Sequence, residues 1–289
     1  MEPDARAAGV AALNALPPRV RLINFDIDRV TSADTIEHII SRAARGEGGW
    51  VLTPNLDILR RVVTEPDTRA LCERTTLRVA DGMPLIWASC LQRTPLPERV
   101  TGSDLILTLT RRCAEAGLGV YLLGGDINPD GTTVADAAAA RLRELFPSLI
   151  IAGAESPPYG FDKDEAFMAA LAERIKAASP HVVYVAVGFP KQERVIARLR
   201  PHALGAWFLG IGISFSFVSG HVQRAPRFLQ RVGLEWAHRL AQEPRRLFRR
   251  YLIDGIPFAA RLLIGSAWRG LRGGETHRRD AEIAEKRMD

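Results

Sequence analysis

The sequence predicts an α/β fold in which a parallel sheet carries helices on both faces and is followed by a basic helical C-terminal appendage. From Arg19 onward, short apolar runs alternate with segments of helical period, which is the pattern of such a sheet. The chain has 289 residues and is 47% hydrophobic, which is enough for a large buried core. Arginines gather near the C-terminus among apolar residues. Together these features predict a Rossmann-like domain with a cationic appendage.

The first half of the chain contains three apolar runs that we expect to form strands, at 20–26, 49–52 and 77–80. Ser32 is the expected N-cap of a helix over 32–45, and a helical pattern over 56–75 is interrupted at Glu65-Pro66. Ser103 is the expected cap of the next helix, which ends near Gly117.

The second half of the chain repeats the alternation of strand and helix. Apolar runs rich in β-branched or aromatic residues predict strands at 119–123, 149–154, 182–187 and 206–211. Segments with helical period predict helices between them at 132–146, 164–178 and 191–199.

The positive charge of the chain is concentrated in its C-terminal part. Residues 224–289 contain 15 Lys and Arg against 8 Asp and Glu, a balance of +7, whereas the whole chain carries +6. A local charge favours a local anionic partner, such as phospholipid headgroups or a diphosphate, and disfavours nucleic acid. We therefore divide the chain into an N-terminal extension (1–18), an α/β catalytic domain (19–228), a basic amphipathic membrane-associated appendage (229–268) and a polar tail (269–289).

Several classes of protein are disfavoured. Three scattered cysteines indicate neither a disulfide framework nor a zinc cluster. No stretch reaches the ~20 uninterrupted apolar residues that span a bilayer, and the first 18 residues do not form the pattern of a secretory signal. We expect a cytoplasmic protein that lies on the inner face of the cell membrane, with homo-oligomerisation left open.

Polar side chains follow the strand predicted at 49–52. In open parallel sheets, ligands bind beyond the carboxyl ends of the strands. Thr53 and Asn55 offer a hydroxyl and an amide there, which suit hydrogen bonding to a sugar or a nucleobase. Either residue equally suits the N-cap of the helix that follows.

A carboxylate, Asp81, follows the strand predicted at 77–80 and precedes Gly82. At a strand end, Asp81 suits a general base that removes a proton from an attacking hydroxyl. The alternative is a simple Asp-Gly turn, which is common in proteins.

Glycines and a short polar motif follow three other strands. Gly124, Gly125, Gly210 and Gly212 allow backbone amides to approach a phosphate, but they form no complete G-x-G-x-x-G fingerprint, so no dinucleotide cofactor is expected. The run 188–193 places Lys191 and Gln192 at a strand-to-helix junction, where a helix N-terminus favours an anionic ligand. Plain helix initiation is the alternative for this run.

Neither the histidines nor the carboxylates show metal-ligand spacing, and no Asp-x-Asp follows a strand, so no metal is expected. Arg239, Arg246 and Arg249 lie at intervals of seven and three, which places them on one face of a continuous helix. Such a face suits bidentate binding of a diphosphate in place of a metal. The alternatives are a solvated or lipid-facing basic helix, or a helix broken at Pro244.

Eight motifs in order resemble the WecG/TagA/CpsF family of bacterial glycosyltransferases, glycosyltransferase family 26, over roughly residues 20–250. The motifs are Thr53-Pro54-Asn55, Ala80-Asp81-Gly82-Met83-Pro84, Glu98-Arg99-Val100-Thr101-Gly102-Ser103-Asp104, Gly124-Gly125, Gly188-Phe189-Pro190-Lys191-Gln192-Glu193, Gly210-Ile211-Gly212, Arg224-Ala225-Pro226 and Leu234-Glu235-Trp236.

The resemblance implies an inverting, metal-independent transfer of a hexose or an N-acetylhexosamine, similar to N-acetylmannosamine, from a UDP-sugar. The implied acceptor is a polyprenyl-diphosphate-linked sugar at the cytoplasmic membrane, in cell-surface polysaccharide or teichoic-acid-type biosynthesis. It implies that Asp81 is the catalytic base, that Thr53 and Gln192 are catalytic residues beside it, and that Asn55 is a polar residue that binds substrate in the active site. It also implies that Arg239, Arg246 and Arg249 meet the diphosphate when the appendage closes over the site.

One position departs from the family pattern. Phe215 is followed by Ser216, where the family commonly has Phe-Asp, so a carboxylate suited to nucleotide recognition is missing. Two other classes of function remain open from the residues alone, a nucleotide-binding oxidoreductase and a basic membrane-binding scaffold. The sequence does not reveal which sugar is transferred or which acceptor receives it.

Overall fold

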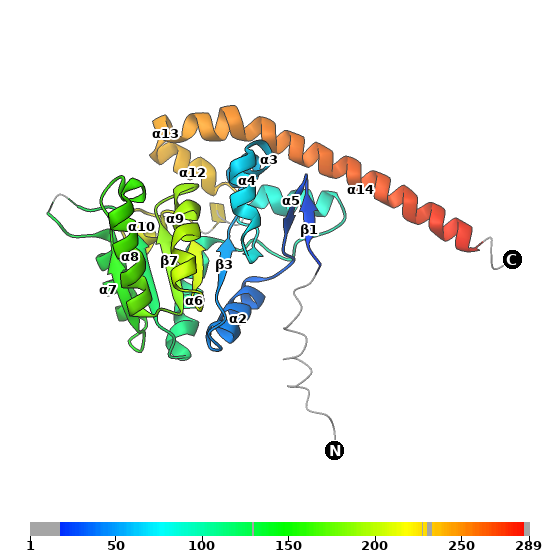
Figure 1. Ribbon diagram of the computed structural model, residues 1–289. Helices are drawn as coiled ribbons and strands as arrows, with labels where there is room; N and C mark the ends of the chain where they lie inside the picture. The colour runs from blue at the N-terminus through cyan, green and yellow to red at the C-terminus, as the bar shows by residue number, and fades with distance from the viewer. Residues whose placement is uncertain (1–17, 129, 227, 230–232, 286–289) are drawn as a thin grey trace, which may run out of the picture.

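The computed structural model describes residues 18–128, 130–226, 228–229 and 233–285, with the side chains of all of these except 246 and 273–285. The predicted extension over 1–18 therefore lies outside the described residues apart from Pro18. The described chain is an α/β domain whose C-terminal helices cross one end of the sheet (Figure 1).

Six parallel strands form the central sheet in the order β4-β3-β8-β7-β5-β6, which confirms the predicted fold class. These strands lie within about two residues of the predicted ranges. They are β3 (Gly49–Leu52), β4 (Leu77–Arg78), β5 (Val120–Gly124), β6 (Ile151–Glu155), β7 (Val182–Ala186) and β8 (Trp207–Gly210).

Helices cover both faces of the sheet, and short 3-10 helices join some of them to the strands. The α-helices of the domain are α2 (Ser32–Ala43), α3 (Leu56–Thr64), α4 (Pro66–Glu73), α5 (Met83–Leu91), α6 (Gly102–Glu115), α7 (Val134–Leu145), α8 (Glu165–Ala178), α9 (Lys191–Leu199) and α10 (Ser214–Val218). The 3-10 helices are η1 (Phe161–Lys163) and η2 (Arg200–His202).

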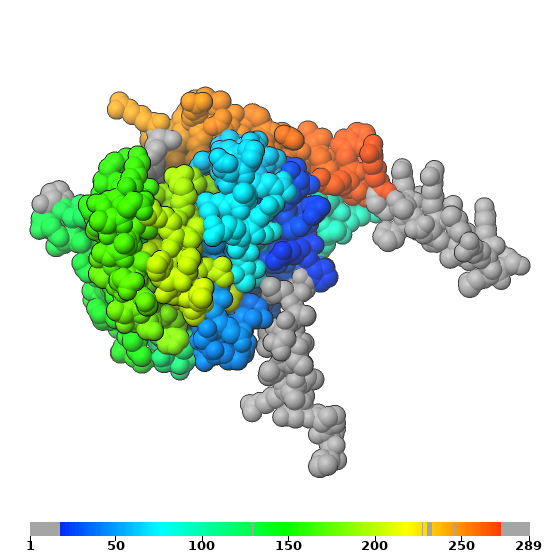
Figure 2. Space-filling model, in the orientation of Figure 1, coloured from blue at the N-terminus to red at the C-terminus, as the bar shows by residue number. Residues whose placement is uncertain are grey.

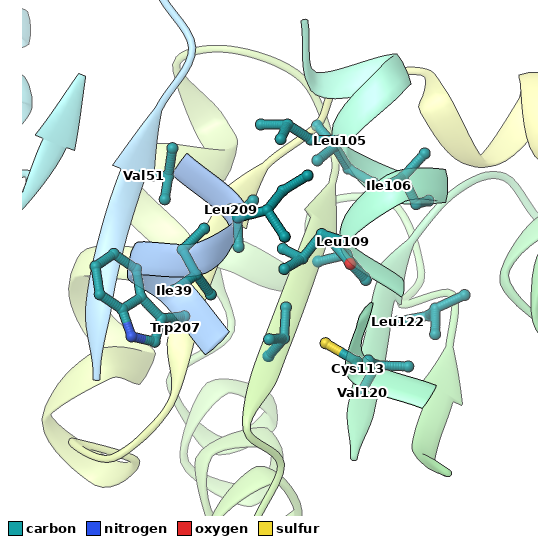
Figure 3. Close-up of a cluster of buried hydrophobic side chains, with 14 of the residues drawn as sticks. Ile39, Val51, Leu105, Ile106, Leu109, Cys113, Val120, Leu122, Trp207 and Leu209 are labelled. Carbon is teal, nitrogen blue, oxygen red and sulfur yellow. The ribbon is translucent and has the colours of Figure 1, made fainter. Parts of the chain in front are cut away.

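Alternate side chains of the central strands enter two different cores, because successive residues of a strand point to opposite faces. Along β7, Val182 and Tyr184 pack with α2, α6, α7 and α10, whereas Val183 and Val185 pack with α8 and α9. Figure 3 shows part of the first core, where side chains of α2 and α6 meet those of β3, β5 and β8. The sheet is thus buried on both faces, and the loops at its strand ends are the part of it that can form a site.

The segment predicted as one strand over 20–26 is a hairpin of two antiparallel strands, β1 (Val20–Leu22) and β2 (Phe25–Ile27). The chain reverses at Ile23-Asn24, and Ile23 has a φ of 59°. The hairpin packs on a third buried cluster with α3, α5 and α14. The prediction is wrong because the periodicity of a short apolar run does not reveal a two-residue turn inside it.

Two helices begin earlier than predicted, at threonine caps. Thr31 caps α2 in place of Ser32, and Thr101 caps α6 in place of Ser103. In each case the threonine Oγ1 accepts the N–H of an aspartate three residues later, at 3.1 Å in α2 and 3.0 Å in α6. The predicted break at Glu65-Pro66 is confirmed as the junction between α3 and α4.

Helix α5 has no counterpart in the prediction. Its nine residues are apolar apart from Ser89, so no polar face produces a period of 3.6. Helix α5 fills the space between the hairpin and the C-terminal segment, and Leu85 and Ala88 are fully buried there.

The C-terminal segment is divided into four consecutive helical elements rather than one continuous helix. They are α12 (Glu235–Gln242), α13 (Pro244–Phe248), the π-helix η3 (Arg249–Gly255) and α14 (Ile256–Glu285). Helix α14 runs through the boundary predicted at 268/269 between appendage and tail. Among the described residues, no helix is both long and apolar enough to cross a bilayer.

Helix α14 docks on the domain along α5. Phe258 and Leu262 enter the third buried cluster with the hairpin and α3. Gly270 lies so close to the backbone of α5 that an added Cβ would sit 2.1 Å from the carbonyl oxygen of Leu91. Figure 2 shows this segment as an orange band that runs over the cyan and blue parts of the domain.

Candidate active site

The carboxyl ends of β3, β4 and β8 bring together residues that are far apart in the sequence. The N–H of Asp81 donates to the carbonyl oxygen of Pro54 at 2.9 Å, which joins the ends of β4 and β3. The hydroxyl of Thr53, which is buried, donates to the carbonyl oxygen of Gly210 at 3.4 Å, which joins β3 to β8. The predicted polar residues Thr53, Asn55 and Asp81 therefore lie at one edge of the sheet.

Asp81 is half-buried, and burial raises the pKa of its carboxyl from 3.8 to about 7. Arg99 and Arg224 act against this rise in pKa, and so does a hydrogen bond from the backbone N–H of Gly102. Glu235 adds to the rise by charge repulsion. A carboxyl group that titrates near neutral pH is suited to accept a proton from a hydroxyl.

Four charged side chains form a network beside Asp81. Arg99 Nη1 lies 3.3 Å from Glu235 Oε2, and Arg224 Nε lies 3.4 Å from Glu235 Oε1. Arg224 also forms a bidentate pair with Asp104, at 2.5 Å and 3.2 Å. The partners come from the loop before α6, from α6, from the segment before α12 and from α12 itself.

Sequence reasoning assigns no role to Arg99, Arg224 or Glu235, although all three lie within the quoted motifs. Residues 99 and 235 are 136 positions apart. Only the motifs themselves signalled these residues, because no local spacing places a side chain of α12 beside a loop that precedes α6.

Gln192 is almost completely buried and connects two loops. Its Oε1 accepts the N–H of Gly212 at 3.1 Å, and its Nε2 donates to Glu193 Oε1 at 3.0 Å. A Cβ added to Gly210 would lie 2.3 Å from Gln192 Nε2, so only glycine fits there. Gln192 therefore holds the loop after β8 in place.

Glu193 is a second buried carboxyl at this edge. Burial raises its pKa to about 7, and its Oε2 has no hydrogen-bond partner among the described residues. Its Oε1 orients the amide of Gln192 through the hydrogen bond described above.

Asn55 serves as the N-cap of α3, as its alternative interpretation predicts. Its Oδ1 accepts the N–H groups of Asp57 and Ile58, each at 3.1 Å. Gly82 packs close by, since its added Cβ would lie 3.7 Å from Asn55 Cα. The capping bonds use only the amide oxygen of Asn55.

The glycines at the carboxyl end of β5 are mainly sites of close packing. An added Cβ at Gly124 would lie 2.6 Å from the carbonyl oxygen of Ala186, and one at Gly125 would lie 3.0 Å from Val134. Gly212 is different, because its added Cβ meets nothing within 4 Å. Lys191, at the start of α9, places its Nζ over the rings of Tyr159 and Phe161.

The structure does not bring Arg239, Arg246 and Arg249 onto one helix face. Pro244 begins a new helix, so the three fall on α12, α13 and η3. The side chain of Arg246 lies outside the described residues, and the structure assigns no ion pair to Arg239 or Arg249 within the described part. The alternative of a helix broken at Pro244 is the one observed.

The appendage is nevertheless held at the strand ends by another arginine. Arg250 Nε lies 3.0 Å from Asp57 Oδ2, in the first turn of α3. In the described residues, no group of three or more histidine, cysteine or acidic side chains has the arrangement of a metal site.

The family model described as the glycosyl transferase WecG/TagA/CpsF family matches residues 20–272 of this chain. The match covers the sheet, the site described above, and the appendage up to the first half of α14.

Proposed function

Because the chain belongs to the WecG/TagA/CpsF family and is therefore a glycosyltransferase of polysaccharide biosynthesis, we propose that it transfers a sugar from a UDP-sugar to a polyprenyl-diphosphate-linked sugar. A nucleotide-sugar donor and a sugar acceptor follow from the family. UDP, a hexose or N-acetylhexosamine similar to N-acetylmannosamine, and the lipid-linked acceptor are our proposals. The family assignment removes the alternatives of an oxidoreductase and of a scaffold.

The proposed reaction is a single displacement with inversion. The acceptor hydroxyl oxygen attacks the anomeric carbon, and its proton passes to the carboxylate of Asp81. The bond from that carbon to the UDP oxygen breaks, and its electron pair leaves on that oxygen with UDP. The observation that carries this role is the position of Asp81 at the strand ends together with its pKa of about 7.

Charge that develops on the departing UDP needs cations or N–H donors. We assign this role to Lys191, to the backbone around Gly210 and Gly212, and to Arg239, Arg246 and Arg249 on the appendage. The support is that α12 and η3 contact the same end of the sheet, through Glu235 and Arg250. No step of this proposal requires a metal or a cofactor.

The proposed function is tested by measuring UDP release from a panel of UDP-sugars, with and without a short-chain polyprenyl-diphosphate sugar, in EDTA. We expect acceptor-dependent release by the wild type and a loss of about 10²- to 10⁴-fold in Asp81→Asn, since general-base catalysis typically contributes that much.

The matched control is Asp67→Asn, which changes an exposed carboxyl in the first turn of α4 that does not take part in the network beside Asp81. It should keep wild-type turnover. Near-normal turnover in Asp81→Asn would remove Asp81 from the role of base, and no release from any UDP-sugar would contradict the choice of UDP.

We also propose that the protein lies on an anionic membrane through its C-terminal segment. Large apolar side chains on η3 and α14 are more than half exposed on the side that faces away from α5. This outer stripe consists of Ile253, Ile256, Ile264, Trp268 and Leu271. Exposed arginines at 261 and 269 lie along the same helix, which suits the interface of an anionic lipid surface.

A further inference from the structure

Glu235 is the residue through which the C-terminal segment reaches the surroundings of Asp81. It lies in the first turn of α12, and its two carboxylate oxygens contact two different arginines, Arg99 and Arg224. The three side chains are 16% to 20% exposed, so water screens their interaction only in part.

We propose that Glu235 is a positioning residue for the general base, which holds Arg99 away from a direct pair with Asp81. The proposal rests on the proposed function, in which Asp81 accepts the proton of the acceptor.

The two arginines differ in how firmly they are held. Arg224 has a second anchor, because Asp104 binds it in bidentate fashion and Thr101 accepts a further hydrogen bond from it at 3.4 Å. Arg99 has Glu235 as its one ion-pair partner among the described residues. The N–H of Val100 donates to the carbonyl oxygen of Ala80 at 2.8 Å, so the loop that carries Arg99 is bound to the strand end that carries Asp81. Loss of the Glu235 carboxylate therefore frees Arg99 to bind the carboxyl of Asp81 instead.

The charges that face Asp81 set the direction of the effect. Arg99 precedes α6, Arg224 precedes α12, and both lower the pKa of Asp81, as does the N–H of Gly102; Glu235 on α12 raises it. Replacing Glu235 by a neutral amide removes the raising charge and leaves the cations unbalanced. The pKa of Asp81 should then fall, and a carboxylate with a lower pKa is a weaker base.

The test is the pH dependence of kcat/KM for UDP release in Glu235→Gln. Activity that needs ionised Asp81 rises with pH through the pKa of that group, so the acidic limb should move to lower pH by about one pH unit. The plateau should fall by roughly tenfold. Glu235→Asp, which keeps the charge, should restore the position of the acidic limb.

The matched control is Glu144→Gln, which removes an arginine-paired carboxylate near the C-terminal end of α7. Its profile should coincide with that of the wild type. An acidic limb that stays in place in Glu235→Gln, whether turnover falls or not, would overturn the proposal. A lower KM for the donor with an unchanged limb would also overturn it, because Glu235 would then merely occupy the arginines that bind the donor.

A second measurement separates this inference from the proposed function. The carboxyl carbon of Asp81 can be titrated by NMR in protein labelled with ¹³C at aspartate, with Asp81→Asn identifying its signal. A lower titration midpoint in Glu235→Gln supports the positioning role even in the absence of UDP release. An unchanged midpoint overturns it even in an active transferase.

Discussion

At the scale of single residues, the burial that suits two carboxyl groups to proton transfer also lowers the stability of the fold above neutral pH. Asp81 and Glu193 are both placed where burial raises the carboxyl pKa to about 7. A carboxyl that binds its proton more tightly in the folded state stabilises the fold at low pH. That contribution is lost as the pH rises from the unfolded pKa, near 4, towards the folded pKa. Above pH 7 the ionised side chains therefore weaken the fold.

Asp81→Asn should raise the thermal stability at pH 8 while it removes activity. The raised pKa of Asp81 corresponds to as much as about 4 kcal/mol at pH 8, since each pKa unit is worth ~1.4 kcal/mol, and Asn still accepts the N–H of Gly102. We expect Tm to increase by several degrees at pH 8 and the gain to shrink as the pH is lowered to 5. A gain of equal size at both pH values would show that ionisation of Asp81 is not its source.

At the scale of elements, the docking of α14 on α5 depends on one close backbone contact. Gly270 meets the carbonyl oxygen of Leu91, whereas Gly265, one and a half turns earlier on α14, has nothing within 4 Å of an added Cβ. The two glycines occupy the same helix but differ in what surrounds them, so they form a natural pair of test sites.

Gly270→Ala should loosen α14 from α5 around this contact, because the added methyl group collides with backbone that has no rotamer to change. Faster amide hydrogen exchange in α5 and in the part of α14 from Phe258 to Gly270 is the expected result. Gly265→Ala should instead be neutral or stabilise α14 by up to about 1 kcal/mol through helix propensity. Equal exchange in the two variants would contradict the close contact.

At the scale of the whole molecule, the C-terminal segment has two apolar sides. One side buries Phe258 and Leu262 against the domain, and the other presents the outer stripe. Removal of everything after about Gly233 is the obvious way to test what this segment does. This truncation, however, strips Phe258 and Leu262 from the third cluster, and their burial is worth roughly 1.5–3 kcal/mol each. Membrane binding is therefore better tested by point variants than by truncation.

The variant Ile264→Ser/Trp268→Ser should bind vesicles that contain phosphatidylglycerol at least about tenfold more weakly than the wild type, because two exposed apolar side chains lose their burial in the interface. The matched control is Leu204→Ser, which removes an exposed leucine at the opposite end of the sheet, before β8. Co-sedimentation with vesicles is the measurement. Equal binding by wild type and double variant would exclude the outer stripe as the lipid-facing surface.

The sequence alone identifies the parallel sheet, most of its helices and the polar residues at its strand ends. Apolar runs, caps and helix breaks are local signals, so they predict the elements. Because ligands bind beyond the carboxyl ends of parallel strands, Asp81, Thr53 and Gln192 are then candidates for the site. The pattern fails where local signals are weak or misleading, as in the hairpin at Ile23-Asn24 and in α5, which has no polar face.

Tertiary structure alone decides which charges surround Asp81 and where the C-terminal segment lies. Glu235 meets Arg99 across 136 positions, Arg250 meets Asp57, and Gly270 meets Leu91. Such contacts depend on how whole helices dock. The free energy of docking comes from many buried side chains in different parts of the chain, so no single segment of the sequence predicts it. The sequence by itself therefore determined the fold class and the candidate base, and only the folded chain determined the neighbours that tune this base.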